Sequence, residues 1–178
     1  VRGVLAKAAA EDAVAFLKGV KHASGQNYIV GTGDRVFDFE ASAGKVVEFR
    51  PSDDGSVVFH TNHPVANDDL KPWHRAMRQL MSPAQWASSN SPTRFASIEK
   101  RLHRPPAAID EDAIKAALRS QDSARHPICR SLAAGAAYYT FGATVMTLSG
   151  RPSLQVTMGP PDVNAFVRLE FSGPAVSR

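Results

Sequence analysis

Residues 27–60 read NYIVGTGDRVFDFEASAGKVVEFRPSDDGSVVFH, a succession of short apolar runs separated by turn-forming residues. The runs at 27–31, 36–40, 45–50 and 57–60 are rich in β-branched and aromatic residues, which favour strands. Three turn signals lie between them: Gly33-Asp34, Ala43-Gly44 and Asp53-Asp54-Gly55. Connections this short join strands that run in opposite directions, so we expect a four-stranded antiparallel meander.

Helical patterns precede and follow this region. Apolar residues at i, i+3, i+4 and i+7 predict an amphipathic helix over 8–21 that covers a sheet, the four being Ala13, Phe16, Leu17 and Val20. Residues 64–90 mix loop formers with large aromatics, which indicates a loop with one or two short helices. Ser91 and Pro92 predict the cap and first residue of a helix that runs to 104.

The C-terminal part repeats the pattern of helix followed by strands. Asp110 is the expected cap of a helix over 111–120, and strands are expected at 139–148, 153–158 and 165–171. The order of one helix, four strands, two or three helices and three strands predicts an α+β fold with layered, mostly antiparallel sheets. At 178 residues, the chain is expected to form a single domain over 1–178.

Composition excludes several classes of function. The net charge of +4 is mildly basic, but the 21 Lys and Arg residues are spread along the chain, which argues against nucleic acid as a partner. No apolar run approaches the roughly 20 residues of a membrane span, and no signal peptide pattern is seen. A single cysteine excludes an internal disulfide framework. We therefore expect a cytoplasmic protein without a membrane partner.

The densest cluster of polar side chains lies at 60–69, which read HTNHPVANDD. We expect the preceding strand to end where Pro64 removes a backbone donor, with His60 and Asn62 on one strand face and Thr61 and His63 on the other. A fixed carboxamide can donate to an oxyanion and accept from an ammonium, which makes Asn62 a candidate catalytic residue. The alternative that Asn62 only forms a turn before Pro64 stays open.

Other reactive residue types have plainer interpretations beside the functional ones. His60 and His63 would splay to opposite faces with no compact third ligand, so no metal site is predicted. Together with Trp73 they are candidate substrate contacts, although Trp73 also fits a core or rim aromatic. Cys129 has no free α-amino group beside it and fits a buried small hydrophobe, although neighbouring basic residues would support a reactive thiol.

Six segments, in this order, resemble the family typified by isopenicillin N N-acyltransferase. The members of this family are self-processing cysteine peptidases of the N-terminal-nucleophile hydrolase superfamily. The six segments are HASGQNY at 22–28, SAG at 42–44, HTNHP at 60–64, SPTRF at 91–95, HPICR at 126–130 and GPP at 159–161.

The resemblance implies an αββα sandwich and an exposed N-terminal cysteine whose thiol attacks an amide or thioester, with no cofactor. It also implies that this chain is the C-terminal part of such an enzyme, because the cysteine would precede Val1. Asn62 matches the asparagine beside the nucleophile. Arg94 resembles the arginine that orders the nucleophile's surroundings, and its expected place in the first turn of a helix favours an anionic neighbour. The alternative that Arg94 is a solvated helix arginine stays open.

Two functions follow as expectations. In the first, the chain belongs to an amide hydrolase or acyltransferase whose substrate is a small amide or acyl thioester. The chain alone is then expected to be inactive, because it lacks the segment with the cysteine. In the second, it is a non-catalytic relative that serves in binding or assembly, and self-association covers the surfaces left by the missing segment.

Overall fold

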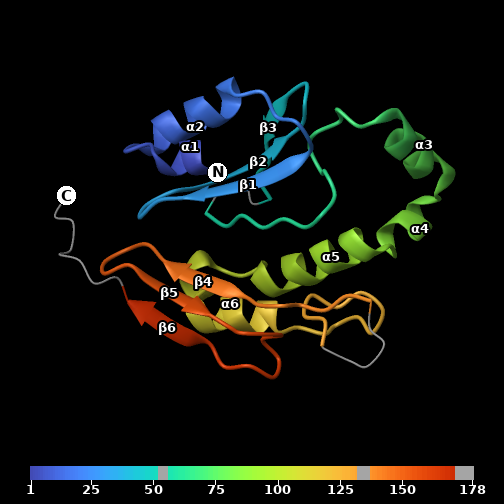
Figure 1. Cartoon of the computed structure of the whole chain (residues 1–178). Coiled ribbons are helices and arrows are strands. Elements are labelled where there is room, and N and C mark those ends of the chain that lie inside the picture. The colour runs from blue at the N-terminus through green and yellow to red at the C-terminus, as the bar shows by residue number, and fades with distance from the viewer. Residues whose placement is uncertain (52–55, 132–136, 171–178) are drawn as a thin grey trace. The chain divides into compact units, whose positions relative to one another are not determined.

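A computed structural model describes residues 1–51, 56–131 and 137–170, and its elements form two compact units, Val1–Pro92 and Thr93–Arg178 (Figure 1). Each unit contains helices and one three-stranded antiparallel sheet, which confirms the α+β class. The layered αββα arrangement and the single domain stay predictions.

The sheet of the first unit has the strand order β1-β2-β3. Its strands are β1 (Gln26–Gly31), β2 (Val36–Ala41) and β3 (Val46–Glu48). The two turns predicted between them close with backbone hydrogen bonds, from Thr32 N–H to Arg35 O and from Ser42 N–H to Lys45 O, each 2.8 Å. β2 is therefore the central strand and is paired along both sides.

The two faces of β2 are used differently. Helix α2 (Ala10–Gly19), which follows the short α1 (Arg2–Leu5), covers one face, where the Lys18 ammonium lies 5.2 Å from the centre of the Phe39 ring. Side chains alternate along a strand, so Asp38 and Glu40 point to the opposite face. Both are buried there. A strand that looks amphipathic thus buries its acidic side as well as its aromatic side.

The fourth strand of the predicted meander does not form. Residues 57–61 lie in an irregular segment, and the turn predicted at 53–55 falls outside the described residues. The segment that follows passes over the acidic face of β2, where its backbone N–H groups at 65–67 donate to the Glu40 carboxylate. These hydrogen bonds hold residues 65–67, which lie beyond the predicted strand, against β2.

Short helices occupy 72–87, as the sequence indicates. They are α3 (Pro72–Leu80) and α4 (Pro83–Ala87), and Ser82 and Gln85 form a capping box at the start of α4. Helix α5 (Asn90–Leu102) begins one residue before the predicted cap, Ser91. Pro92 still fits, because backbone N–H groups in the first turn need no helical acceptor.

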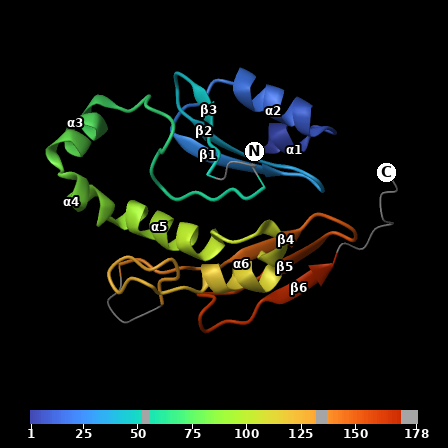
Figure 2. The same cartoon turned by 180° about the vertical axis from the view of Figure 1, so that it is seen from behind.

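The second unit packs α6 (Glu111–Leu118) on one face of the sheet β4-β5-β6, as the opposite views in Figures 1 and 2 show. The strands are β4 (Thr144–Thr147), β5 (Ser153–Val156) and β6 (Val167–Glu170), and a 3-10 turn, η1 (Pro106–Ala108), precedes α6. Asp110 caps α6 as predicted, accepting from Ala113 N–H at 2.8 Å. Glu111 then accepts from Gln155 on β5, which ties helix to sheet.

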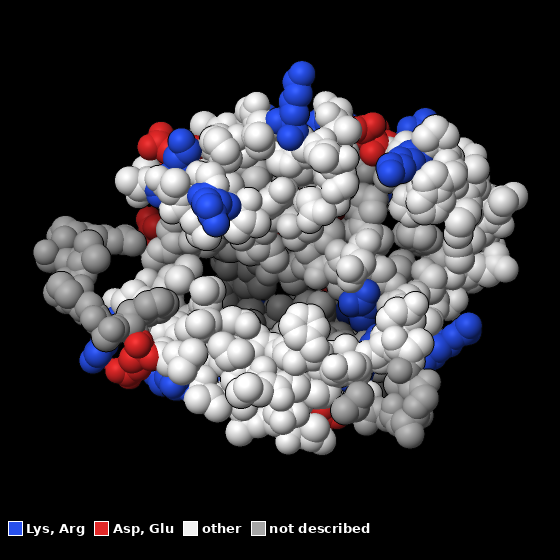
Figure 3. Space-filling model, in the orientation of Figure 1, with Lys and Arg blue, Asp and Glu red and all other residues white. Residues whose placement is uncertain are grey.

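The described surface shows no concentrated positive patch on the face drawn in Figure 3, where Lys and Arg appear singly and among acidic residues. In the described part of the chain, no helix has the length and apolar character needed to cross a membrane.

Candidate functional site

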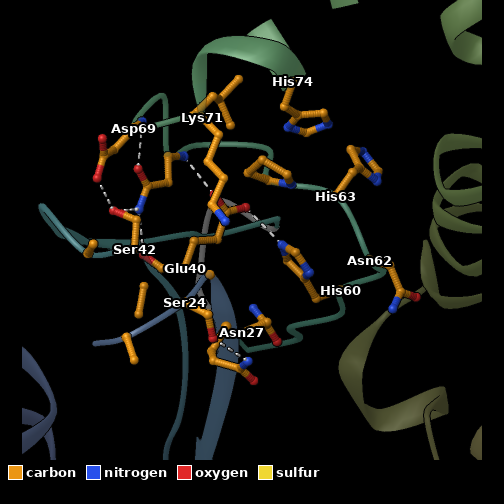
Figure 4. Close-up of a pocket in the computed structure, with 18 of the residues that line it drawn as sticks. Ser24, Asn27, Glu40, Ser42, His60, Asn62, His63, Asp69, Lys71 and His74 are labelled. Carbon is orange, nitrogen blue, oxygen red and sulfur yellow. Dashed lines mark hydrogen bonds and ion pairs between the residues drawn. The ribbon is translucent and has the colours of Figure 1, made fainter. Parts of the chain in front are cut away.

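The first unit contains a pocket of about 730 Å³ between the acidic face of β2 and the segment that runs from His60 to α3 (Figure 4). The strands supply its floor and the irregular segment supplies its walls. Its polar and aromatic lining includes Ser24, Asn27, Glu40, Ser42, His60, Asn62, His63, Asp69, Lys71, Trp73 and His74. The candidate residues His60, Asn62, His63 and Trp73 thus meet in one cavity.

The Glu40 carboxylate accepts four hydrogen bonds in this pocket. Its Oε1 accepts from His60 Nε2 at 2.8 Å and from Val65 N–H at 2.6 Å. Its Oε2 accepts from the N–H groups of Ala66 at 3.0 Å and Asn67 at 2.6 Å. Burial opposes ionisation, but these four hydrogen bonds outweigh it and lower the pKa of Glu40 below its ordinary value.

His60 lies between two acceptors. Its Nε2 reaches Glu40, its Nδ1 lies 2.5 Å from the carbonyl oxygen of Thr61, and its ring meets Phe49 edge-on. The side chains of His60 and Glu40 are each only 5% exposed. Burial alone would lower the pKa of His60, but the bonds to Glu40 and to the Thr61 carbonyl raise it above its ordinary value.

A second carboxyl group, Asp38, lies on the same face of β2 and is fully buried. Its Oδ1 accepts from Asn27 Nδ2 at 2.5 Å, whereas its Oδ2 has no hydrogen-bond partner among the described residues. Burial raises the pKa of Asp38 above its ordinary value, and the nearby negative charge of Glu40 acts in the same direction. The three groups Asp38, Glu40 and His60 form one electrostatically coupled cluster.

Asn67 and Asp69 fasten the far wall of the pocket. Asn67 Nδ2 donates to the Glu40 backbone carbonyl at 2.9 Å, and its Oδ1 accepts from Asp69 N–H at 3.0 Å. Asp69 Oδ2 accepts from Ser42 Oγ at 2.6 Å and from Gly44 N–H at 2.9 Å. A Cβ at Gly44 would lie 2.6 Å from that oxygen, so a side chain at residue 44 would require the Asp69 carboxylate to shift.

His63 connects the opposite wall to the start of α5. Its Nδ1 lies 2.9 Å from Ser91 Oγ and 3.2 Å from Thr61 Oγ1, and its ring packs edge-on against Trp86. Ser91, expected to cap the helix, instead joins this side-chain network. Trp73 is 62% exposed and touches His74, so it is a rim aromatic and not a core residue.

Asn62 is exposed on the pocket wall, to one side of the Glu40–His60 pair in Figure 4. It is not held on a strand face with His60, because residues 57–62 form no strand. Figure 4 also shows the Lys71 side chain extending into the pocket from the start of α3. Asn62 is thus an exposed residue at the edge of the pocket lining.

Arg94 belongs to the second unit and lies in the second turn of α5, since that helix begins at Asn90. The expected first-turn position is therefore wrong. Arg94 is half-buried, and burial, followed by the positive charge of Arg130, lowers its pKa. Two neighbouring guanidinium groups favour an anion, and the role of Arg94 near a nucleophile stays a prediction.

Cys129 is fully buried, which agrees with its interpretation as a small hydrophobe. Its Sγ donates to Asp162 Oδ1 at 3.3 Å. Burial, the largest influence, raises the pKa of the thiol, so the reactive thiolate is disfavoured. In the described part of the chain, no three His, Cys, Asp or Glu side chains are grouped to hold a metal ion.

Glu40 and Asn67 line the pocket and were not predicted from the sequence, nor was the buried Asp38 that lies on the same strand face as Glu40. A signal was present in the β2 stretch, where acidic and aromatic residues alternate as Phe37-Asp38-Phe39-Glu40. In a central strand, such alternation places acids on a face that another segment can bury.

Comparison with known proteins identifies one family. The family model described as acyl-coenzyme A:6-aminopenicillanic acid acyl-transferase matches residues 1–149, a range that includes the whole pocket. It agrees with the resemblance noted in the sequence. A search of curated proteins found no match to this chain.

Proposed function

Because the chain belongs to the acyl-coenzyme A:6-aminopenicillanic acid acyl-transferase family, we propose that its pocket holds a small amide or acyl thioester for acyl transfer to water or an amine. The observation that carries this proposal is the position of Asn62, which is among the residues that line a pocket large enough for a small molecule. We further propose the αββα sandwich of the N-terminal-nucleophile hydrolases as the complete architecture.

In this reaction a thiolate attacks the carbonyl carbon, and the carbonyl oxygen becomes a tetrahedral oxyanion. Asn62 Nδ2 is the proposed donor to that oxygen. The oxyanion collapses as the amine or thiol leaves with a proton, and water or an amine then takes the acyl group from the thioester intermediate. A positioned donor of this type contributes about 10²-fold to the rate.

The attacking thiol is proposed to lie outside this chain. Cys129 is its single cysteine, and that thiol is buried, bonded to Asp162 and shifted toward the neutral form. We expect the purified chain to show no turnover of S-hexanoyl-N-acetylcysteamine or hexanamide, with Cys129→Ala unchanged. Turnover that depends on Cys129 would overturn this part of the proposal.

Binding tests the pocket independently of turnover. In NMR titrations with hexanamide, we expect resonances of the pocket residues to shift, and Asn62→Ala to weaken the affinity about tenfold, the loss of one good hydrogen bond. Gln79→Ala, an exposed carboxamide on α3, is the matched control and should bind as the wild type does. Absence of any pocket shift would contradict the proposed acyl-donor site.

A second candidate function is assembly, and the observation that favours it is the uncovered face of the second sheet. Ser153 and Gln155 face α6 and are buried, so the alternate residues of the strands point away from the helix. Apart from Thr144 these are apolar, and three of them are about half exposed: Met146 at 58%, Val167 at 55% and Leu169 at 52%. Sheet faces of this kind pack on another sheet, and we propose a second copy of the chain as the partner.

A further inference from the structure

The chain between His60 and Asn67 is held at both ends by a single carboxylate. Glu40 accepts from the His60 ring where the segment begins and from the N–H groups of residues 65–67 where it ends. Asn62 and His63 lie between these two attachments. We infer that Glu40 is the positioning residue of the Asn62 segment, acting as a carboxylate paired with a His60 imidazolium; its importance for catalysis rests on the proposed function.

The charge of Glu40 follows from the number of its donors. A carboxylate offers about four lone-pair sites, and two donors reach each oxygen of Glu40. The three backbone N–H groups can only donate, so a proton on Glu40 would displace one of them. The ionised carboxylate is the form that satisfies every contact.

The charge of His60 follows in the same way. Nε2 faces the ionised Glu40, and Nδ1 faces the carbonyl oxygen of Thr61, which can only accept. Both ring nitrogens must therefore carry a proton, as in an imidazolium. A neutral His60 ring has one N–H group and would lose one of these two hydrogen bonds. Loss of the bond to Thr61 would release the backbone directly before Asn62.

The surroundings of His60 favour its charged form. Burial would lower the pKa of His60, but the bonds to Glu40 and Thr61 raise it, and the charge of Asp38 adds to the rise. The other titratable side chains that line the pocket are His63, Asp69, Lys71 and His74. A raised folded-state pKa means that the imidazolium stabilises the fold at low pH and that this stabilisation is lost as pH rises through that pKa.

Glu40→Gln tests the inference directly. Glutamine has one carbonyl oxygen, and its NH₂ group would face N–H donors to which it cannot bond. It therefore cannot accept the four hydrogen bonds that the Glu40 carboxylate accepts. We expect protection of the Ala66 and Asn67 amides from hydrogen exchange to fall about tenfold or more, and the Asn62 side-chain resonances to move. The matched control is Glu48→Gln in β3, whose carboxylate pairs with Arg50 and should leave both readouts unchanged. Unchanged exchange and Asn62 resonances in a folded Glu40→Gln would overturn the inference.

The unsubstituted chain provides a test that needs no variant. Nitrogen-15 NMR of the His60 ring should show both nitrogens protonated at neutral pH, and the Asn62 resonances should change with the same pH midpoint as that ring. A His60 ring that is neutral at pH 7 would overturn the inference even if Glu40→Gln fails to fold.

The same samples separate this inference from the proposed function. If the wild type binds hexanamide at Asn62, Glu40→Gln should weaken that affinity about tenfold while Glu48→Gln keeps it. If the wild type binds no amide, the acyl-donor proposal fails. The exchange and ring measurements then still decide whether Glu40 positions the segment.

Discussion

Asp38 is a buried carboxyl group in which only one oxygen has a hydrogen-bond partner among the described residues. Burial raises its pKa, so the neutral acid stabilises the fold at low pH and this stabilisation is lost as pH rises through the raised pKa. Asp38→Asn keeps the size of the group and removes the titration. We expect the free energy of unfolding of the variant, relative to that of the wild type, to increase as pH rises from about 4 to about 8. Urea unfolding at both pH values measures this, and a relative loss toward high pH would contradict it.

Asp122 shows the opposite shift. Hydrogen bonds from Arg101 and Ser97 lower its pKa to about 2, so its contribution to stability is present above the unfolded value and is lost as pH falls toward 2. The side chain is 42% exposed, and solvent screening limits the pair to about 1 kcal/mol at most. We expect Asp122→Asn to lower the free energy of unfolding by that amount at pH 7. The difference should shrink as pH falls from about 4 to about 2, and a difference that stays constant with pH would refute the assignment.

Some residues of the pocket could be predicted from the local sequence, and others could not. Asn62, His60, His63 and Trp73 were predicted from one local cluster, and the pocket gathers all four. Glu40 was missed because its role depends on a segment about 25 residues later in the chain crossing over β2. Such a crossing leaves no local pattern in either stretch.

At the scale of elements, α6 is the clearest case of a helix fixed by its cap. Asp110 accepts from Ala113 N–H, and the next residue, Glu111, ties the helix to the sheet. Asp110→Ala removes the cap without disturbing that tie, and we expect a loss of about 1 kcal/mol of unfolding free energy. Asp112→Ala is the control, because that side chain is 91% exposed and its ion pair with Lys115 is long, at 3.6 Å. Equal losses in the two variants would contradict a specific cap.

Helices and hairpins were predicted more reliably than the path of the chain between them. The pattern at 13, 16, 17 and 20 and the cap at Asp110 are local, and both α2 and α6 form where expected. The run 57–60 has strand composition, yet it forms no strand, since a strand also needs a free sheet edge and a register. The residues that follow at 65–67 donate to the Glu40 carboxylate on the acidic face of β2.

At the scale of the whole molecule, the uncovered apolar face of the second sheet predicts concentration-dependent association. Leu169 pairs with Leu154 across β5 and β6, and Val156 pairs with Val167, so the face is continuous over both strands. A charge in its middle must be desolvated when another surface covers it, which opposes association. We therefore expect Leu169→Lys to shift the protein toward the monomer in sedimentation velocity experiments. Leu80→Lys is the matched control, because Leu80 is 85% exposed at the end of α3 in the other unit. If both variants sediment as the wild type does, the sheet face is not the surface that associates, and the assembly candidate loses its support.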